Sequence, residues 1–220
     1  MSVSVVTGAN RGIGLELCRE LKRRGREVVA VCRERSKELD ELSIRVVDQV
    51  DVVDAAGIAK LGKELSHDSI DLLVNNAGIL RPDSLEAVET DSIRTQLEVN
   101  ALAPLLVTKA LLPRMKSGAK LALITSRMGS IGDNSSGGYY GYRMSKAALN
   151  AAGMSLAHDL RSRGIAVLIL HPGFVRTQMT AGHGAVAPAE SARGLLDRID
   201  ELTLENTGRF LHMNGETLPW

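Results

Sequence analysis

The fold of this chain is decided near its N-terminus, by the stretch Val3-Ser4-Val5-Val6-Thr7-Gly8-Ala9-Asn10-Arg11-Gly12-Ile13-Gly14. Its first four residues are a short run rich in β-branched side chains, which predicts a buried strand. Beyond the glycines, Ile13, Leu17 and Leu21 recur at helical spacing. The glycines therefore lie in a turn between the end of a strand and the start of a helix.

A glycine-rich turn in this place is suited to holding a pyrophosphate. Glycine permits a tight turn and a close approach of phosphate to backbone amides, and the helix N-terminus supplies partial positive charge. The spacing Gly-x-x-x-Gly-x-Gly differs from the commonest dinucleotide fingerprint. Because turn geometry alone can also require glycines, the alternative of a purely structural turn stays open at this point.

Strand-like apolar runs alternate with helical patterns along the rest of the chain. The further predicted strands are 28–32, 44–47, 70–74, 120–125, 165–170 and 209–213. Continuous apolar strands separated by helices indicate a parallel sheet covered on both faces. We therefore expect an α/β, Rossmann-type doubly wound fold of about seven strands, with its ligand at the carboxyl ends of the strands.

Length, charge and cysteine content disfavour several other classes of protein. A chain of 220 residues suits one α/β domain over 1–220, and a net charge of +1 with interspersed signs predicts no nucleic-acid partner. Cys18 and Cys32 show neither a disulfide pattern nor zinc spacing, so we expect no metal and a reducing compartment. The absence of a long apolar run and a strand that starts at residue 3 predict no membrane segment, no signal peptide and a cytoplasmic location.

Tyr142 and Lys146 are four residues apart, which places them on one face of a helix, one turn apart. A free tyrosine titrates near about pH 10, and a neighbouring cation favours the phenolate and lowers that pKa. The pair is therefore typical of a general acid. Tyr139 and Tyr140 are alternative acids, but neither is followed at this spacing by an amine that can exchange a proton.

Asn100 lies in an amphipathic helical pattern, with Pro104 four residues beyond it. Proline has no amide hydrogen, so the Asn100 carbonyl loses its helical partner and needs water or another donor. One interpretation is a kinked helix with a solvated carbonyl. The other is a bound water that continues a proton relay from Lys146 to solvent.

These residues occur together in a known order. The chain resembles the short-chain dehydrogenase/reductases over its whole length, on Thr7-Gly-x-x-x-Gly-Ile-Gly14, Asn75-Asn-Ala-Gly78, Asn100, Ser126, Tyr142-x-x-x-Lys146 and Pro172-Gly173 with Thr177. The regions 128–146 and 214–220 are similar to the branch that contains C-factor signalling proteins and sniffer-type carbonyl reductases.

The resemblance implies an NAD(P)H-dependent oxidoreductase that reduces an aldehyde or ketone to an alcohol. Tyr142 would donate the proton, Lys146 would lower the pKa of the tyrosine and hold the nicotinamide ribose, and Ser126 would bind the substrate oxygen. Asn100 would belong to the proton relay. Ser130 is an alternative to Ser126, which directly follows a predicted strand.

The cofactor site implied by the resemblance is spread over the turns after several strands. Besides Tyr142 and Lys146, its residues are Gly8, Asn10, Arg11, Gly12, Ile13, Gly14, Asn76, Ala77, Gly78, Pro172, Gly173, Val175 and Thr177. Asp48 closes the third predicted strand, where the family's adenine-contacting aspartate lies. A helix cap or a turn is the alternative role for Asp48.

Arg33, at the end of the second predicted strand, decides which cofactor we expect. An acidic residue there would bind the ribose of NAD and repel the extra phosphate of NADP. Arg33 and Arg11 are cations, and two guanidiniums can bind a phosphate through charge-assisted hydrogen bonds. We therefore predict NADP(H) over NAD(H), with ordinary surface charges as the alternative.

The substrate is not identified by the sequence. The short segment 174–187 indicates a mobile lid, and Phe174, Met128 and Met179 are candidates either for an apolar pocket or for packing. The partners that we expect are a small carbonyl compound and, by resemblance, a second copy in a homodimer. A signalling or regulatory protein on the same fold is the alternative function.

Overall fold

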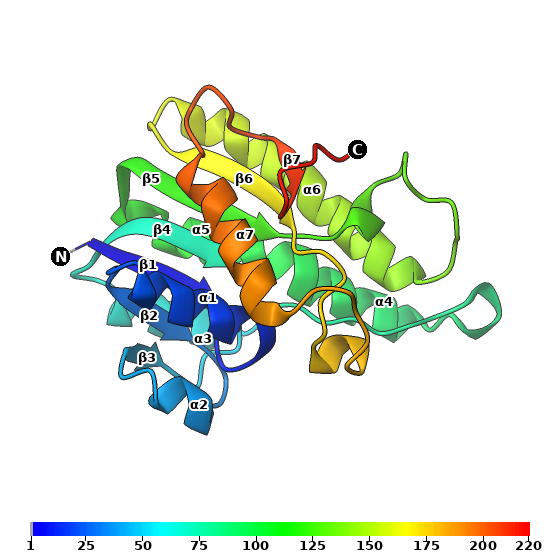
Figure 1. Ribbon diagram of the computed structural model, residues 1–220, viewed down its shortest axis with the longest axis horizontal. Coiled ribbons are helices and arrows are strands. Elements are labelled where there is room, and N and C mark those ends of the chain that lie inside the picture. Colours follow the sequence, from blue (N-terminus) through cyan, green and yellow to red (C-terminus); the bar gives the residue numbers. More distant parts are fainter. Residues whose placement is uncertain (1) are drawn as a thin grey trace.

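A computed structural model describes residues 2–220. Its centre is a seven-stranded sheet of order β3-β2-β1-β4-β5-β6-β7, in which every neighbouring pair is parallel (Figure 1). The strands are β1 (Ser2–Thr7), β2 (Val28–Val31), β3 (Arg45–Val47), β4 (Ser69–Asn75), β5 (Met115–Ile124), β6 (Ala166–His171) and β7 (Phe210–His212). The predicted doubly wound α/β fold is confirmed.

The start of β5 is the largest difference from the predicted strands. The observed strand begins at Met115 rather than at residue 120. Hydrophobic patterning misses its first part because the sequence 116–118 is polar and resembles a loop. Gly118 has a φ of +87°, and the pairing of β4 with β5 shifts register between Met115 and Lys120. The first part of β5 is therefore joined to the buried part through an irregularity that hydrophobic patterning does not reveal.

Helices cover both faces of the sheet (Figure 1). The helices are α1 (Gly12–Arg23), α2 (Lys37–Asp40), α3 (Ala55–Glu64), α4 (Thr90–Leu97), α5 (Ala103–Leu111), α6 (Tyr140–Arg161) and α7 (Pro188–Asp200). Short turns of 3₁₀-helix lie at Leu85–Ala87, Leu112–Arg114, Arg127–Gly129 and Gln178–Thr180, and a π-helix lies at Glu98–Leu102. In the part of the chain that the structure describes, no helix has the length and apolar character needed to span a bilayer.

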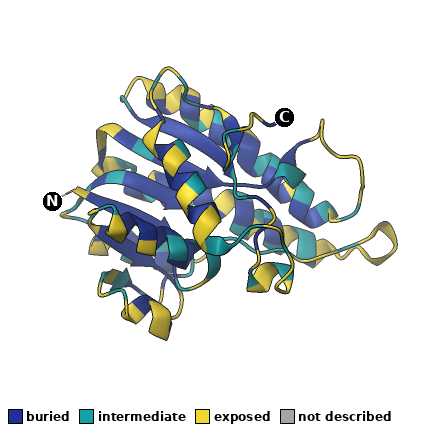
Figure 2. Cartoon of the chain, in the orientation of Figure 1, coloured by how far each residue is buried: buried dark blue, intermediate teal, exposed yellow. Residues whose placement is uncertain are grey.

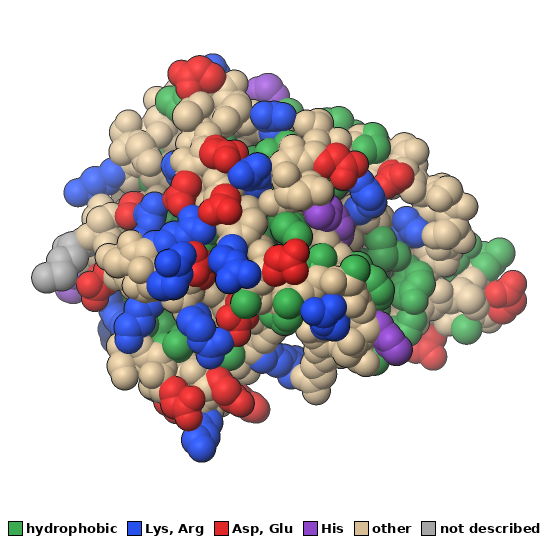
Figure 3. Space-filling model, viewed as in Figure 1, with side chains coloured by type: hydrophobic (Ala, Val, Ile, Leu, Met, Phe, Trp, Pro, Cys, Tyr) green, Lys and Arg blue, Asp and Glu red, His purple; other side chains and the backbone are tan. Residues whose placement is uncertain are grey.

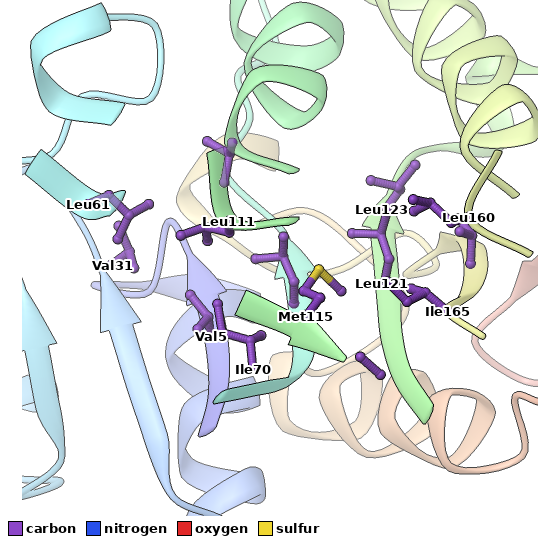
Figure 4. Close-up of a cluster of buried hydrophobic side chains, with 14 of the residues drawn as sticks. Val5, Val31, Leu61, Ile70, Leu111, Met115, Leu121, Leu123, Leu160 and Ile165 are labelled. Atoms are coloured by element: carbon purple, nitrogen blue, oxygen red, sulfur yellow. The ribbon is translucent and has the colours of Figure 1, made fainter. Parts of the chain in front are cut away.

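Each face of the sheet has its own hydrophobic cluster, and the strands between them are buried (Figure 2). Successive side chains of a strand point to opposite faces, so Val5 joins one cluster and Val6 the other. Residues from α3, α5 and α6 pack in the first cluster (Figure 4), and residues from α1, α2 and α7 in the second. This burial fixes the register of the sheet and thereby the positions of the turns at its edge.

The winding direction of the sheet reverses between β1 and β4. The chain proceeds from β1 to β2 and β3 on one side, and from β4 to β5, β6 and β7 on the other. The turns that follow β1 and β4 therefore leave the sheet side by side, without a crossing helix between them. Such a reversal is where open α/β sheets bind ligands, at the carboxyl ends of the strands.

The packing of α6 on the sheet gives a first testable prediction. A Cβ at Gly153 would lie 2.7 Å from Ile169 side-chain atoms, whereas a Cβ at Gly62 of α3 would meet no atom within 4 Å. We expect Gly153→Ala to lower the free energy of unfolding by about 1–2 kcal/mol through overpacking. Gly62→Ala should raise it by about 0.5–1 kcal/mol through helix propensity. Urea denaturation measures both, and equal shifts in one direction would contradict the packing described.

Candidate active site

A cleft of about 870 Å³ opens at the carboxyl ends of the strands. Its walls come from the turns after β1, β2, β3, β4 and β6, the end of β5, and the first two turns of α6. The sequence-predicted residues that line it are Gly8, Asn10, Arg11, Gly12, Ile13, Gly14, Arg33, Asn76, Ala77, Gly78, Tyr142, Lys146, Pro172 and Thr177. A volume of this size is in the range of small-molecule and cofactor sites.

The turns after β1 and β4 are packed too closely for side chains at two glycines. A Cβ at Gly8, where φ is +64°, would lie 2.8 Å from the Ala77 Cα, and a Cβ at Gly14 would lie 2.2 Å from the Gly8 carbonyl oxygen. The Asn76 side-chain amide donates hydrogen bonds to the carbonyls of Thr7 and Gly8, at 3.0 and 3.2 Å. Gly8 is therefore required by the contact between the two turns, and Gly14 by the close approach of α1 to its own turn.

This turn fits a dinucleotide in a second respect. Helix α1 begins at Gly12, and its N-cap residue Arg11 makes no side-chain cap hydrogen bond. The first backbone N–H groups of α1 thus lack a side-chain cap, and Gly12 and Gly14 next to them line the cleft. Uncapped amides at a helix N-terminus are suited to binding a phosphate.

The far end of the cleft, after β2 and β3, carries charges of both signs. Arg33 lies 3.9 Å from an Asp51 carboxylate oxygen, and Glu34 also lines this end. Asp48 does not line the cleft, and its carboxylate lies 3.9 Å from Arg35. Asp51, three residues later, lines the wall where Asp48 was expected. The repeat of Val-Asp in 47–52 hides this choice from sequence reasoning.

Tyr142 and Lys146 both line the cleft, and both are buried. The Lys146 Nζ lies 5.8 Å from the centre of the Tyr142 ring and donates a 2.9 Å hydrogen bond to the Ile124 carbonyl at the end of β5. Ser126, two residues beyond β5, is buried, and its hydroxyl accepts a hydrogen bond from the Met128 amide. Ser126 does not itself line the cleft, although its neighbour Thr125 does.

The ionisation of this pair differs from the expectation that Lys146 lowers the tyrosine pKa. Burial raises the pKa of Tyr142 to about 12, and a hydrogen bond with Ser126 acts weakly in the opposite direction. Burial also lowers the pKa of Lys146 to about 8. Desolvation is the largest cause of both shifts, and the Lys146 amine donates to the Ile124 carbonyl rather than to the phenol. In the protein without ligand, Tyr142 is thus firmly protonated.

The alternative acids and the alternative serine do not line the cleft. Tyr139 adopts a left-handed backbone conformation, with φ +53°, ahead of α6, and its side chain is exposed. Neither Tyr139 nor Tyr140 lines the cleft. The buried Ser130 hydroxyl accepts a hydrogen bond from the Asp133 amide within its own loop. The cleft therefore favours Tyr142 over the other tyrosines, and the hydrogen bond between Tyr142 and Ser126 favours Ser126 over Ser130.

Asn100 is fully buried in the π-helix between α4 and α5. In this π-helix the Ala103 amide donates to the Glu98 carbonyl, which accommodates Pro104 without a sharp break. The Asn100 side chain donates to the Ser145 hydroxyl at 3.0 Å, and Ser145 donates to the Tyr142 carbonyl at 2.8 Å. Asn100 does not line the cleft, but its side chain is connected to the helix that carries the acid.

The segment after β6, which we expected to form a mobile lid, is tied to itself and to the glycine turn by hydrogen bonds. Pro172 and Thr177 line the cleft, whereas Gly173 and Val175 do not. Backbone hydrogen bonds between 174–176 and Val186 close the segment on itself. The Arg11 guanidinium donates a 2.7 Å hydrogen bond to the Gln178 side chain, which links this segment to the glycine turn. Phe174 is exposed, and of the three apolar candidates only Met179 lines the cleft.

Sequence reasoning missed several residues of the site. Asp51, Gln178 and the segment 79–81 line the cleft. Asp83 accepts hydrogen bonds from the amides of the first two residues of α6. The segment 79–81 directly follows the Asn75–Gly78 motif, and that position was the available signal. The partners of Asp83, Tyr140 and Gly141, are more than fifty positions away in sequence, so no local pattern marks Asp83.

Comparisons with known proteins agree with this geometry. The family model for the short chain dehydrogenase matches residues 2–186. A 1-hydroxy-2-glutathionyl-2-methyl-3-butene dehydrogenase of Rhodococcus sp. (strain AD45) is 40% identical, with 100% of both chains covered. The C-signal of Myxococcus xanthus is 46% identical over 69% of this chain and 93% of its own. An NADPH-bound carbonyl reductase from chicken fatty liver is 32% identical, with a TM-score of 0.89 over 100% of this chain and 98% of its own.

The buried amine gives a prediction on stability. Lys146 has a folded pKa of about 8 against an ordinary 10.5, so below pH 8 the folded protein buries a charge. Between these two values the unfolded chain binds more protons, and stability rises with pH. We expect Lys146→Met to raise the free energy of unfolding at pH 7 by about 1–2 kcal/mol, by a margin that narrows towards pH 10.

Urea denaturation at several pH values measures this margin. Lys109→Met, at an exposed position of α5, is the matched control and should change neither the stability nor its pH dependence. A Lys146→Met protein that is less stable than the wild type at pH 7 would contradict the assignment of a buried, destabilising ammonium.

Proposed function

We propose that this chain, which belongs to the short-chain dehydrogenase family, is an NADPH-dependent reductase of aldehydes or ketones. The observation that carries the proposal is one cleft lined both by a glycine turn that fits a dinucleotide and by the buried pair Tyr142 and Lys146. A hydride donor site and a proton donor that share a cleft are what carbonyl reduction requires.

The similar proteins support this choice of reaction. The chicken protein is named a carbonyl reductase and binds NADPH, and the Rhodococcus protein is named a dehydrogenase of a glutathionyl alcohol. Both names describe the interconversion of an alcohol and a carbonyl compound. We therefore propose this interconversion for the present chain and place a glutathionyl aldehyde among the compounds to be assayed.

When bound, NADPH supplies a hydride to the carbonyl carbon. Tyr142 donates its phenolic proton to the carbonyl oxygen as negative charge develops there, and the Ser126 hydroxyl hydrogen-bonds the same oxygen. The Lys146 ammonium stabilises the phenolate that Tyr142 becomes, because both groups are buried and their attraction is weakly screened. The Asn100 side chain holds the helix that carries Tyr142 through Ser145. We propose that the backbone carbonyl of Asn100 binds the water of a proton relay.

The high tyrosine pKa supports reduction as the direction at neutral pH. With a pKa near 12, Tyr142 holds its proton at every physiological pH, so the protonated form that reduction requires is the form present. The reverse reaction needs the phenolate as a base, and burial makes the phenolate unfavourable. Oxidation of an alcohol should therefore become efficient only at alkaline pH.

The preference for NADPH rests on the two arginines of the cofactor end. Arg33 and Arg11 both line the cleft, on the turns after β2 and β1. We propose that they bind the phosphate that distinguishes NADPH from NADH. The Asp51 carboxylate lies 3.9 Å from Arg33, and we propose that it keeps the guanidinium in place when no phosphate is bound.

A signalling role on the same fold is the second candidate, because the M. xanthus C-signal is 46% identical over 69% of this chain. The buried pair Tyr142 and Lys146 favours retained chemistry over a purely regulatory protein. A cytoplasmic location and a homodimer stay proposals. Leu102, at the end of the π-helix, and Leu105, in α5, are exposed. Their apolar side chains support the dimer because a second copy could cover them.

Removal of the Tyr142 hydroxyl tests the proposed reduction. We expect Tyr142→Phe to lower kcat/KM by about 10²- to 10⁴-fold, because the substrate oxygen loses its acid. NADPH oxidation with a panel of small aldehydes, ketones, quinones and a glutathionyl aldehyde measures it, and Tyr140→Phe is the matched control that should retain activity. A Tyr142→Phe protein as active as the wild type, or no oxidation with any compound, would overturn the proposal.

Removal of Arg33 tests the cofactor. We expect the ratio of kcat/KM with NADPH to that with NADH to fall by about 10- to 100-fold in Arg33→Ala, because charge-assisted hydrogen bonds to the phosphate are lost. Arg19→Ala, on the exposed side of α1, should leave the ratio unchanged. A wild-type protein that uses NADH better than NADPH would exclude the assignment.

A further inference from the structure

One wall of the cleft, formed by residues 79–81, runs alongside the acid. It starts beside the catalytic amine, since a Cβ at Gly78 would lie 3.6 Å from the Lys146 Nζ. The same loop ends at Asp83, whose carboxylate accepts hydrogen bonds from the first two amides of α6, just before Tyr142. The wall therefore extends along the two turns of α6 that carry the reacting groups.

Two buried side-chain amides fix the backbone of this wall. The Ile79 amide donates to Asn100 at 2.8 Å, and Asn100 donates to the Ile79 carbonyl at 2.9 Å. Gln96, one helical turn earlier, pairs in the same way with Arg81: its carbonyl oxygen accepts from the Arg81 amide at 2.9 Å, and its nitrogen donates to the Arg81 carbonyl at 3.2 Å. Both residues are fully buried, so Arg81 starts from a fixed backbone position.

Gln96 also places Arg81 close to the acid. A Cβ at Gly141 would lie only 2.5 Å from the Gln96 nitrogen, so the first turn of α6 packs directly on this amide. Gly141 is the residue before Tyr142. One amide side chain therefore separates the backbone of Arg81 from the backbone next to the proton donor.

The guanidinium of Arg81 carries a charge that the structure does not neutralise. Its side chain is exposed and lines the cleft, and within residues 2–220 no carboxylate is within ion-pair distance of it. The acidic residues that line the cleft, Glu34 and Asp51, lie at the other end, after β2 and β3. The substrate end thus contains Arg81 and Lys146 and no lining acid.

We propose that Arg81 is a specificity-determining residue that binds a carboxylate, so that the substrate class is an aldehyde or ketone that also carries a carboxylate group. A guanidinium binds a carboxylate through two parallel hydrogen bonds, which gives orientation as well as affinity. Anchored at Arg81, such a substrate presents its carbonyl to Tyr142 in a restricted geometry. This inference rests on the proposed reductase function.

The test compares acids with their uncharged methyl esters. We expect the wild type to reduce 4-formylbenzoate, or the linear ω-oxo acid of best-fitting chain length, with a kcat/KM about tenfold or more above that of the ester. The difference should lie mainly in KM and should shrink as ionic strength rises. In Arg81→Gln the ratio of acid to ester should fall towards one, while Arg81→Lys should retain part of it.

Two further variants make the test specific. Arg94→Gln removes an exposed arginine of α4 that pairs with Asp91 and does not line the cleft, and it should keep the wild-type ratio. Gln96→Met should lower the acid preference, because the backbone of Arg81 is no longer fixed. Thermal unfolding confirms that each variant is folded.

The outcomes separate this inference from the proposed function. Reduction of esters and neutral aldehydes without any preference for acids, at every chain length, would overturn the role of Arg81 and leave the reductase intact. An Arg81→Gln protein with the wild-type ratio would do the same. Failure of all compounds to oxidise NADPH would instead overturn the proposed function.

Discussion

The structure depends on the contact between the turns that follow β1 and β4. These strands are neighbours although five helices and strands separate them in sequence, and the winding reverses between them. Only glycine fits at Gly8, where the two turns meet, and at Gly14, where α1 packs on the Gly8 carbonyl. Because Gly12 and Gly14 at the start of α1 also line the cleft, the same constraint that closes the fold shapes the place that we propose for the dinucleotide.

Tyr142 and Lys146 line the same cleft, and their burial has a cost in stability. Tyr142 and Lys146 are each shifted towards the neutral form by desolvation, in opposite directions on the pH scale. The fold retains them because α6 is held from both sides, by the Lys146 hydrogen bond to β5 and by Asp83 at the helix N-terminus. On the face of the molecule that Figure 3 shows, acidic and basic side chains are interspersed, and apolar side chains gather towards the end where α4 and α6 lie.

The sequence was sufficient for the sheet and for the residues that carry local motifs. Strand runs, the glycine turn and the Tyr142–Lys146 spacing are short-range patterns; the sheet that they predict is confirmed, and residues of the turn and of the pair line one cleft. Long-range contacts were not predictable in this way: Asp83 reaches α6 across more than fifty residues, and Gln96 is an ordinary polar residue until its partner Arg81 is known. The direction of the Tyr142 pKa was also missed, because helical spacing reports a neighbouring charge but not the depth of burial.

The central claim is that hydride and proton meet at one carbonyl in this cleft. The most direct measurement uses NADPH labelled with deuterium at the transferable position and follows the label by mass spectrometry and NMR. We expect the label on the carbinol carbon of the alcohol, in a single stereochemical position. Product without label, or label lost to water, would contradict direct transfer in the cleft and with it the role given to Tyr142.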